Sequence, residues 1–270
     1  MKTPLRILHV ITTISRGGAE NHLLDLILLQ RQEGIEVTAR EGRLRFLTEV
    51  ASQVGAQFVA TAHTADDQAE TVLHRIVRGT GIAGLIGIPP ARPLGPRVTL
   101  IRPLLQLRRQ EVRTFLQALG QDARQDMSNY DTLFTRNRLR HEVIPYLRQH
   151  INPQIHDALV RLAALAAEAQ GVIDNQVERW MRRASIRRDA HAVSANLSVL
   201  RRAPRYILCE MFRRLWSEQS WPLQEFGQAD WAQLADLVHA TKKLQGWNLP
   251  GGITVRRSRD RLTITKNSDI

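Results

Sequence analysis

Apolar side chains recur at three- and four-residue spacings over residues 65–76, directly after a short apolar run at 57–61. This pattern predicts a strand followed by a helix that packs one face on the sheet. The predicted apolar face consists of Ala65, Ala69, Val72, Leu73 and Ile76. The turn between the two elements carries His63, Asp66 and Asp67. Because open α/β sheets bind ligands at the carboxyl ends of their strands, we expect a functional site at this turn.

The rest of the first 150 residues continues the alternation of helices and strands. Periodicity predicts a strand at 6–11, helices at 18–32, 40–54 and 107–119, and an arginine-rich helix that ends near 146. The inward face of the 107–119 helix is predicted to be Val112, Phe115, Leu116 and Leu119. Residues 79–103 are rich in Gly and Pro, which predicts an irregular loop that ends in a short strand at 98–101.

The pattern changes near residue 150. A long helix is predicted from 153 to about 183, followed by helices around 208–215 and 231–238. Residues 253–255 and 262–264 alternate in polarity around a turn, which is typical of a hairpin. The predicted fold class is therefore α/β: a Rossmann-like, partial parallel sheet with a second, mainly helical domain that ends in a β-hairpin.

Charge indicates a class of partner. The chain has 38 Lys and Arg against 26 Asp and Glu, which gives a net charge of +12 and a pI near 11.1. Such a chain favours polyanions, because phosphate neutralisation releases counterions. Arginine richness that reflects a GC-rich genome is the alternative.

Cysteine usage and apolar runs bear on the compartment. The single cysteine, Cys209, excludes an internal disulfide and fits a reducing cytoplasm. The chain shows neither an apolar run long enough to span a bilayer nor a signal peptide, so we expect a cytoplasmic protein without membrane association.

Two sets of charged residues are candidates for chemistry. Asp66 and Asp67 are adjacent carboxylates that suit Mg²⁺ or an ammonium group, and the alternative is that they cap the helix. Arg136, Arg138 and Arg140 crowd one turn, and planar guanidinium groups suit phosphates. The five tryptophans are candidates for stacking on bases, except that Trp231 has helical spacing with Leu234 and Val238 and is better explained as a core residue.

Several motifs, taken in order, resemble the bacterial tRNA(Ile)-lysidine synthetases, which are ATP pyrophosphatases of the PP-loop type. The first is the run His-Thr-Ala-Asp-Asp-Gln-Ala-Glu-Thr at 63–71, followed by Arg78-Gly79-Thr80-Gly81. The others are Ile101-Arg102-Pro103-Leu104-Leu105, Asp126-Met127-Ser128-Asn129, Arg136-Asn137-Arg138-Leu139-Arg140 and Leu249-Pro250-Gly251-Gly252. The resemblance covers residues 38 to about 266 and implies an adenine nucleotide alpha hydrolase-like sheet.

This resemblance implies the ATP-dependent ligation of lysine to C2 of the wobble cytidine of tRNA(Ile), with ATP and Mg²⁺ as cofactors. By resemblance, His63, Asp66 and Asp67 are catalytic, and the two aspartates bind the metal. The ATP side of the site is expected to contain Gly17, Gly18, Glu20, Arg78, Gly79 and Gly81. The tRNA side is expected to contain Arg102, Asn129, Arg136, Asn137, Arg138 and Arg140. The bland alternatives are a surface ion pair for Arg102, an interdomain hydrogen-bond network for Asn129 and Asn137, and a structural role for Glu70 and Thr71.

Residues 1–37 differ from that family. The turn Arg-Gly-Gly-Ala-Glu-Asn at 16–21 stands where the family has Ser-Gly-Gly-x-Asp-Ser, whose backbone N–H groups cradle the phosphates of ATP. The segment resembles instead the start of a GT-B glycosyltransferase of the glycosyltransferase 4 type. One βα unit of the synthetase family is also missing after Val37.

The expected domains are an atypical βα segment at 1–37, an α/β domain at 38–148 that lacks the usual phosphate loop, and a helical tRNA-binding domain at 149–270. Three functions compete: a lysidine-forming ligase with impaired ATP use, an ATP-incompetent tRNA-binding remnant of a fused or mis-started gene, and a glycosyltransferase. A dimer is the oligomeric state considered.

Overall fold

The structure is a computed structural model that describes residues 7–10, 39–121, 135–189, 191–222, 226–240 and 244–266. The chain divides into two compact units, 1–167 and 168–270, and the division falls within one long helix, α8 (Ile155–Arg183). The predicted residues Gly17, Gly18, Glu20 and Asn129 lie outside the described residues, as does the predicted helix at 18–32.

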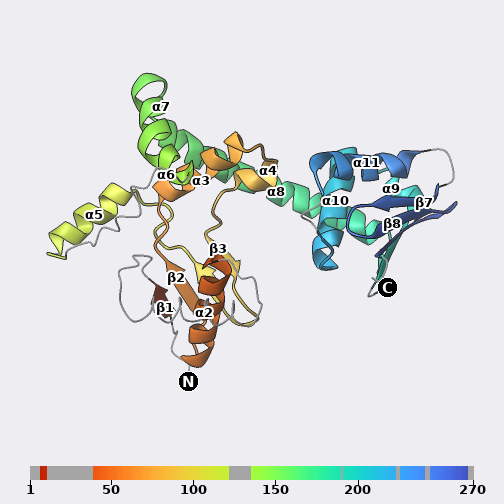
Figure 1. Cartoon of the computed structure of the whole chain (residues 1–270), viewed down its shortest axis with the longest axis horizontal. Coiled ribbons are helices and arrows are strands. Elements are labelled where there is room, and N and C mark those ends of the chain that lie inside the picture. Colours follow the sequence, from red (N-terminus) through yellow and green to blue (C-terminus); the bar gives the residue numbers. More distant parts are fainter. Residues whose placement is uncertain are drawn as a thin grey trace. The chain divides into compact units, whose positions relative to one another are not determined.

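The first unit contains a four-stranded sheet in the order β1-β2-β4-β3 (Figure 1). Its strands are β1 (Ile7–Val10), β2 (Phe58–Thr61), β4 (Thr99–Ile101) and β3 (Ala91–Pro93). β1 and β4 are both parallel to β2, and β3 is antiparallel to β4. The mixed α/β class and the parallel core of the sheet are confirmed, and residues 7–10 belong to the same sheet as β2.

One side of this sheet is covered by α2 (Ala39–Gln53). Leu47 and Ala51 of α2 form a buried cluster with Val59 of β2 and Leu100 of β4. The predicted helix at 40–54 is therefore present, and its apolar residues pack on the strand that leads to the candidate site.

α3 (Ala65–Val77) begins four residues after β2 ends. Its buried residues Ala69 and Val72 pack against Leu159 and Ala163 of α8. The predicted face is buried, but the prediction that it packs on the sheet is wrong, because it packs on α8. Periodicity identifies a buried face but not the element that covers it. At the other end of the face, Ile76 is 41% exposed.

The Gly- and Pro-rich segment after α3 contains a short helix, α4 (Ile82–Leu85), and β3. Gln68 of α3 holds this segment: its Nε2 donates to the Ile86 carbonyl at 2.9 Å, and its Oε1 accepts from the Ile88 N–H at 2.6 Å. Gly87 has φ +68, and a Cβ there would lie 2.4 Å from Gln68 Oε1. A side chain at position 87 would therefore break this contact.

α5 (Arg109–Ala118) differs from its prediction. The helix is present, but none of its residues is buried, and Phe115 and nearby Leu119 are 63% and 56% exposed. The expectation that its apolar stripe faces the core is wrong for this arrangement. Amphipathic spacing reports which residues share a face, and it does not supply a partner for that face.

The arginine-rich helix is built of three continuous pieces: α6 (Thr135–Arg138), a π-helical turn η2 (Leu139–Val143) and α7 (Ile144–His150). Pro145 lies in the first turn of α7. Proline has no N–H, and its ring clashes with the carbonyl four residues earlier in a regular α-helix. The wider π turn just before Pro145 relieves that conflict.

The second unit combines the end of α8 with α9 (Leu197–Leu200), α10 (Arg205–Glu218) and α11 (Gln228–His239). It also contains an antiparallel five-stranded sheet in the order β5-β6-β9-β8-β7. These strands are β5 (Arg187–Arg188), β6 (Ala192–Asn196), β7 (Leu244–Leu249), β8 (Ile253–Arg257) and β9 (Arg261–Lys266). The β8–β9 hairpin is confirmed, whereas the mainly helical description missed the other three strands.

The core of the second unit is aromatic at its centre. Trp216 is fully buried and stacks edge-on against Trp221 and Trp231, with ring centroids 4.9 and 5.3 Å apart. These three tryptophans therefore do not present faces for base stacking. Over the described residues, no helix is long and apolar enough to cross a membrane.

Candidate functional site

The turn between β2 and α3 is stabilised by a capping box. Thr64 has extended backbone angles and donates both its N–H and its hydroxyl to Asp67 Oδ2, at 2.9 and 2.8 Å. His63 precedes the cap, with its Nδ1 3.0 Å from the Thr61 hydroxyl. The capping interpretation is thus confirmed for Asp67, which leaves its Oδ1 for other partners.

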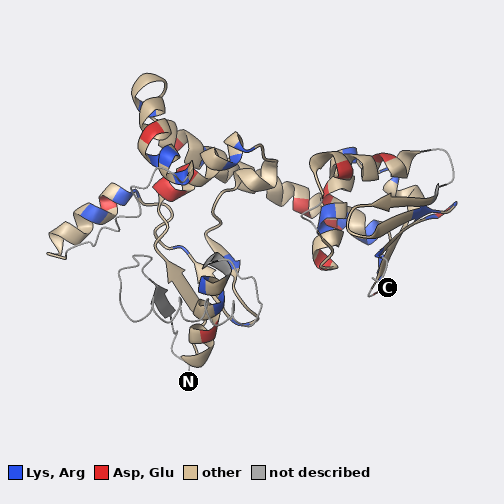
Figure 2. Cartoon of the chain, in the orientation of Figure 1, with Lys and Arg blue, Asp and Glu red and all other residues tan. Residues whose placement is uncertain are grey.

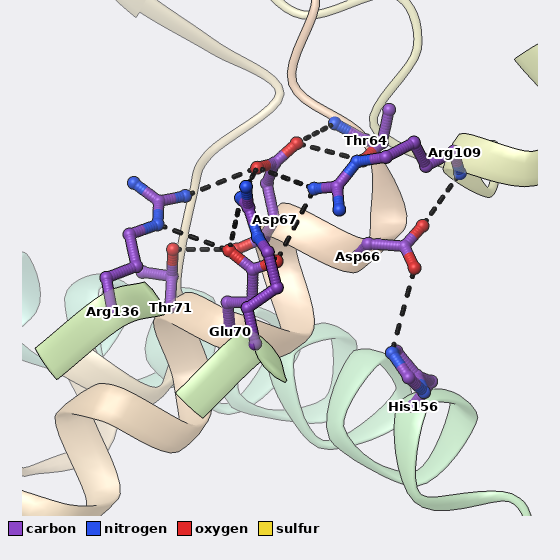
Figure 3. Close-up of polar contacts among 9 residues, drawn as sticks. Thr64, Asp66, Asp67, Glu70, Thr71, Arg109, Arg136 and His156 are labelled. Atoms are coloured by element: carbon purple, nitrogen blue, oxygen red, sulfur yellow. Dashed lines mark hydrogen bonds and ion pairs between the residues drawn. The ribbon is translucent and has the colours of Figure 1, made fainter. Parts of the chain in front are cut away.

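Asp67 Oδ1 faces three guanidinium groups that come from distant parts of the chain. Arg109, Arg136 and Arg140 each place a nitrogen 3.3–3.4 Å from this oxygen. Arg109 begins α5, and the other two arginines lie on α6 and η2. Figure 3 shows Arg109 and Arg136 approaching Asp67 in the first turn of α3 from opposite sides.

The same three arginines bind Glu70, one turn further along α3. Arg140 makes a bidentate pair with Glu70 through Nε at 2.6 Å and a terminal nitrogen at 2.8 Å. Arg136 and Arg109 approach the Glu70 carboxylate at 3.3 and 3.4 Å. We call Asp67, Glu70, Arg109, Arg136 and Arg140 the carboxylate–arginine cluster.

The members of this cluster differ in burial. The Glu70 side chain is 2% exposed and Arg140 is 18% exposed, whereas Arg136 is 47% exposed. Burial raises the pKa of Asp67, but the Thr64 hydrogen bonds and the Arg109 and Arg136 charges outweigh it, so this pKa lies below its usual value. Burial also opposes the charge of Arg140, but the Glu70 carboxylate outweighs it and raises the pKa of that guanidinium.

Asp66 points away from the cluster. Its Oδ2 accepts the backbone N–H of Arg109 at 2.7 Å, and its Oδ1 lies 3.7 Å from Nε2 of His156 on α8 (Figure 3). Burial and the charge of Arg108 lower the pKa of His156, and the Asp66 carboxylate opposes them only in part. The two adjacent aspartates therefore have different partners: Asp67 contacts the three guanidinium groups, and Asp66 contacts the Arg109 N–H and the His156 ring.

A cavity of about 230 Å³ opens beside Asp66. Its polar lining consists of Asp66, Glu70, Arg109, Arg140, Arg148 and His156. Ile144 and Pro145 supply an apolar wall. Carboxylates, guanidinium groups and an imidazole thus face one small space, which suits a ligand that carries both signs of charge.

Asp66 and Asp67 do not fit Mg²⁺ in this arrangement. Their carboxylates diverge, and three guanidinium nitrogens already lie 3.3–3.4 Å from Asp67 Oδ1, where they would repel a dication bound to that oxygen. Among the residues that the structure describes, no group of three or more His, Cys, Asp or Glu is arranged to hold a metal ion. The charge around Asp67 instead favours anionic or neutral neighbours.

The remaining predicted residues lie around this centre. Arg102 is 8% exposed, and its guanidinium donates to the Pro89 carbonyl at 2.6 Å, so it braces the loop from inside. Arg78 and Gly79 are exposed at the end of α3, and Gly81 precedes α4.

Asn137 and Arg138 both lie on α6, where Asn137 is half-buried and Arg138 is exposed. Figure 2 shows Lys and Arg distributed over both units, with both signs of charge meeting around α3 and α6.

Sequence reasoning did not single out Arg109 or His156, and it gave Glu70 only a structural alternative. Arg109 pairs with carboxylates 39 and 42 positions earlier in the chain. No local periodicity reports such a contact. The only available signal was that three carboxylates in one turn require compensating charge.

Comparison with known proteins adds a family. A family described as the PP-loop domain matches residues 8–147. The tRNA(Ile)-lysidine synthase of Geobacter sulfurreducens is 41% identical over 206 residues, which cover 76% of this chain and 42% of that protein. The synthase of Thermus thermophilus is 37% identical over 234 residues, covering 84% of this chain and 41% of that protein. The chain thus spans about two fifths of the length of these relatives.

The family match also corrects the interpretation of the N-terminus. It begins at residue 8 and so includes most of the 1–37 segment, and the resemblance of that segment to a glycosyltransferase finds no support. A solved U34-tRNA thiolase from Methanococcus maripaludis covers 60% of this chain and 62% of its own, at 17% identity and a TM-score of 0.40. That likeness is too weak to indicate function.

Proposed function

Since the chain belongs to the PP-loop domain family, we propose that it catalyses the ATP-dependent ligation of lysine to C2 of the wobble cytidine of tRNA(Ile). The observation that carries this proposal is the 41% identity over 206 residues to a tRNA(Ile)-lysidine synthase. The motif at 63–71 that resembles the synthetase family lies at the carboxyl end of β2, where an α/β sheet offers its ligand site.

The cavity beside Asp66 fits the lysine substrate. Lysine carries ammonium groups and a carboxylate, and the lining offers the Asp66 carboxylate as well as the exposed Arg148 guanidinium. Asp66 would bind an ammonium group, and Arg148 would bind the carboxylate. The apolar wall of Ile144 and Pro145 suits the methylene chain.

ATP supplies the activation of C2 by adenylation. The amine nitrogen then forms a bond to C2 while the bond from C2 to the adenylate oxygen breaks, and AMP leaves. Gly17, Gly18, Glu20, Arg78, Gly79 and Gly81 are the proposed nucleotide side, with Mg²⁺ held by groups other than the Asp66 and Asp67 pair. Within this chain, the cluster residues Asp67 and Glu70 fix the arginines of α5, α6 and η2 around the site.

For the nucleic acid we propose the exposed Arg138, the half-exposed Arg136, and residues 149–270 as the tRNA-binding part. The logarithm of the tRNA binding constant should fall linearly with the logarithm of the salt concentration, because phosphate contacts release counterions. Filter binding of tRNA(Ile) at several salt concentrations measures this slope, and Arg138→Ala should reduce it by about one. A salt-independent affinity would remove the tRNA proposal.

The test of the reaction is transfer of radiolabelled lysine to tRNA(Ile) with ATP and Mg²⁺. Asp66→Asn should abolish transfer, whereas His150→Gln on the outer end of α7 should preserve it. Transfer that persists in Asp66→Asn would show that the site lies elsewhere.

An ATP-incompetent tRNA-binding protein is the second candidate. The sequence Arg-Gly-Gly-Ala-Glu-Asn at 16–21 favours it, because both serines expected of a phosphate loop are replaced. Misplaced donors cost on the order of a hundredfold in rate, so this second candidate predicts at most trace ATP–pyrophosphate exchange. Salt-dependent tRNA binding without exchange or lysine transfer would identify this second function.

A further inference from the structure

His156 has a place beside the cavity that sequence motifs do not account for. It lies in the first turn of α8, and its side chain is 15% exposed. Its Nε2 is 3.7 Å from Asp66 Oδ1, too far for a hydrogen bond but close enough for the carboxylate to stabilise a protonated ring. The other Asp66 oxygen is held by the Arg109 N–H at 2.7 Å, so the carboxylate is fixed from one side and faces the imidazole on the other.

Charges from every neighbouring element act on this imidazole. Burial and the cations Arg108 and Arg148 lower the pKa of His156, while Asp66 and Asp157 oppose them. The net effect is a pKa below the usual value near 6.5. His156 is therefore neutral at neutral pH, with a lone pair available to accept a proton.

The carboxylates of the cluster are poorly suited to the same task. Asp67 Oδ2 already accepts two hydrogen bonds from Thr64, and its Oδ1 faces three guanidinium groups. Glu70 is held by the bidentate pair with Arg140. Among the described groups that line the cavity, His156 is the neutral one with a basic nitrogen.

We propose that His156, with Asp66 as its positioning residue, accepts the proton that the lysine ε-amine loses as it attacks C2. This inference rests on the proposed ligase function. The ε-ammonium group first loses one proton to water, and the lone pair of the free amine forms the N–C2 bond. One N–H bond of that nitrogen then breaks, and its electron pair remains on nitrogen. The proton passes to the imidazole, and the leaving adenylate takes the electron pair of the C2–O bond. Asp66 stabilises the imidazolium until it returns its proton to water.

The pH profile of lysine transfer tests this role. With wild-type chain, the rate should rise with pH through the lowered pKa of His156 as the ring becomes neutral. His156→Gln should lose that rise and at least a hundredfold in rate, since general base catalysis contributes about 10²–10⁴-fold. His150→Gln is the matched control, because His150 lies on α7 against Tyr146 and does not line the cavity. An unchanged rate and profile in His156→Gln would overturn the proposal.

Chemical rescue separates a base from a merely structural residue. His156→Ala leaves space beside Asp66, and added imidazole should restore at least tenfold of the lost rate in proportion to its unprotonated fraction. Loss of activity without rescue, in a variant that folds like the wild type, would make His156 structural and contradict the inference.

A third measurement does not depend on turnover. Histidine ring signals are titrated by NMR in the chain alone and with saturating L-lysine. His156 should titrate below the usual value, and L-lysine should shift its signals while leaving those of His150 in place. A usual or raised titration point, L-lysine that binds without affecting His156, or L-lysine that does not bind would each overturn the inference. If L-lysine shifts His156 but no lysine reaches tRNA, the proposed function fails and the amine site stands.

Discussion

Charged side chains meet at the candidate site of the first unit, whereas apolar side chains meet at the centre of the second unit. In the first, α3, α5 and η2 meet around two carboxylates and three guanidinium groups, with Glu70 at the centre. In the second, α10 and α11 meet around Trp216, Trp231 and other fully buried apolar side chains. The candidate site therefore lies beside an ionic cluster, and among the described residues the apolar clusters of the first unit, around Val59 and around Ala69, are smaller than the apolar core of the second unit.

This difference separates stability from function. Apolar burial is non-directional and depends little on salt or pH, so it suits a scaffold. A buried ion cluster gains little net stability, because desolvation of the charges offsets their attraction. It does fix the direction of each side chain, and it responds to pH and to charged ligands. The cluster is thus a positioning device for the arginines around the cavity.

The largest effect is expected from the apolar core. Trp216→Ala should lower the free energy of unfolding of the second unit by about 4 kcal/mol, because it removes a fully buried indole and leaves a cavity. Urea unfolding followed by circular dichroism measures this loss. Trp247→Ala is the control, since Trp247 is 37% exposed and should cost much less. Equal losses for both would contradict the aromatic core.

The contrast also explains what the sequence could predict. The sequence predicts α3 and α10, because the apolar residues that each helix buries recur at helical spacing within that helix. The candidate site at Asp66 and Asp67 was expected from its place after β2. By contrast, β6 pairs with β9 across nearly seventy residues, and short alternating runs such as β6 and β7 give a weak pattern.

The charged contacts were less predictable for a physical reason. Arg136 and Arg140 read as surface phosphate contacts, because nothing in a sequence shows that carboxylates 66 to 73 residues earlier are their partners. The exposure of Phe115 on α5 was unpredictable for the same reason. The spacing of apolar residues defines a helix face, but only the tertiary structure decides what packs against that face. Periodicity therefore predicts elements better than it predicts partners.

The ionic centre should show the next largest effect. Glu70→Gln keeps the shape of the side chain but removes the most buried carboxylate of the cluster, so that Asp67 alone faces three guanidinium groups. We expect a loss of about 3 kcal/mol in the first unit, the usual cost of breaking a buried pair. Thermal unfolding monitored by calorimetry measures it. Glu178→Gln is the control, because its pair with Arg182 is half-exposed, and a comparable loss there would contradict the importance of burial.

A smaller effect is expected from Asp67 as the pH falls. Its folded pKa lies below the unfolded value of about 3.9, so its contribution is complete above pH 4 and is lost as the pH falls through the folded value. The wild type should lose stability below pH 4 more steeply than Asp67→Asn. Urea midpoints at pH 3, 4 and 6 measure this difference, and parallel pH curves for the two proteins would show that Asp67 contributes no such term.

The smallest effect is expected on α5. Phe115 is 63% exposed, so Phe115→Ser removes little buried surface and should change the free energy of unfolding by less than about 0.5 kcal/mol. Phe212→Ala, at 2% exposure in the second unit, should cost about 4 kcal/mol. Urea unfolding compares the two substitutions directly. A loss near 2 kcal/mol for Phe115→Ser would show that another surface covers α5, and the apolar face of this helix would then contribute to stability as the buried clusters do.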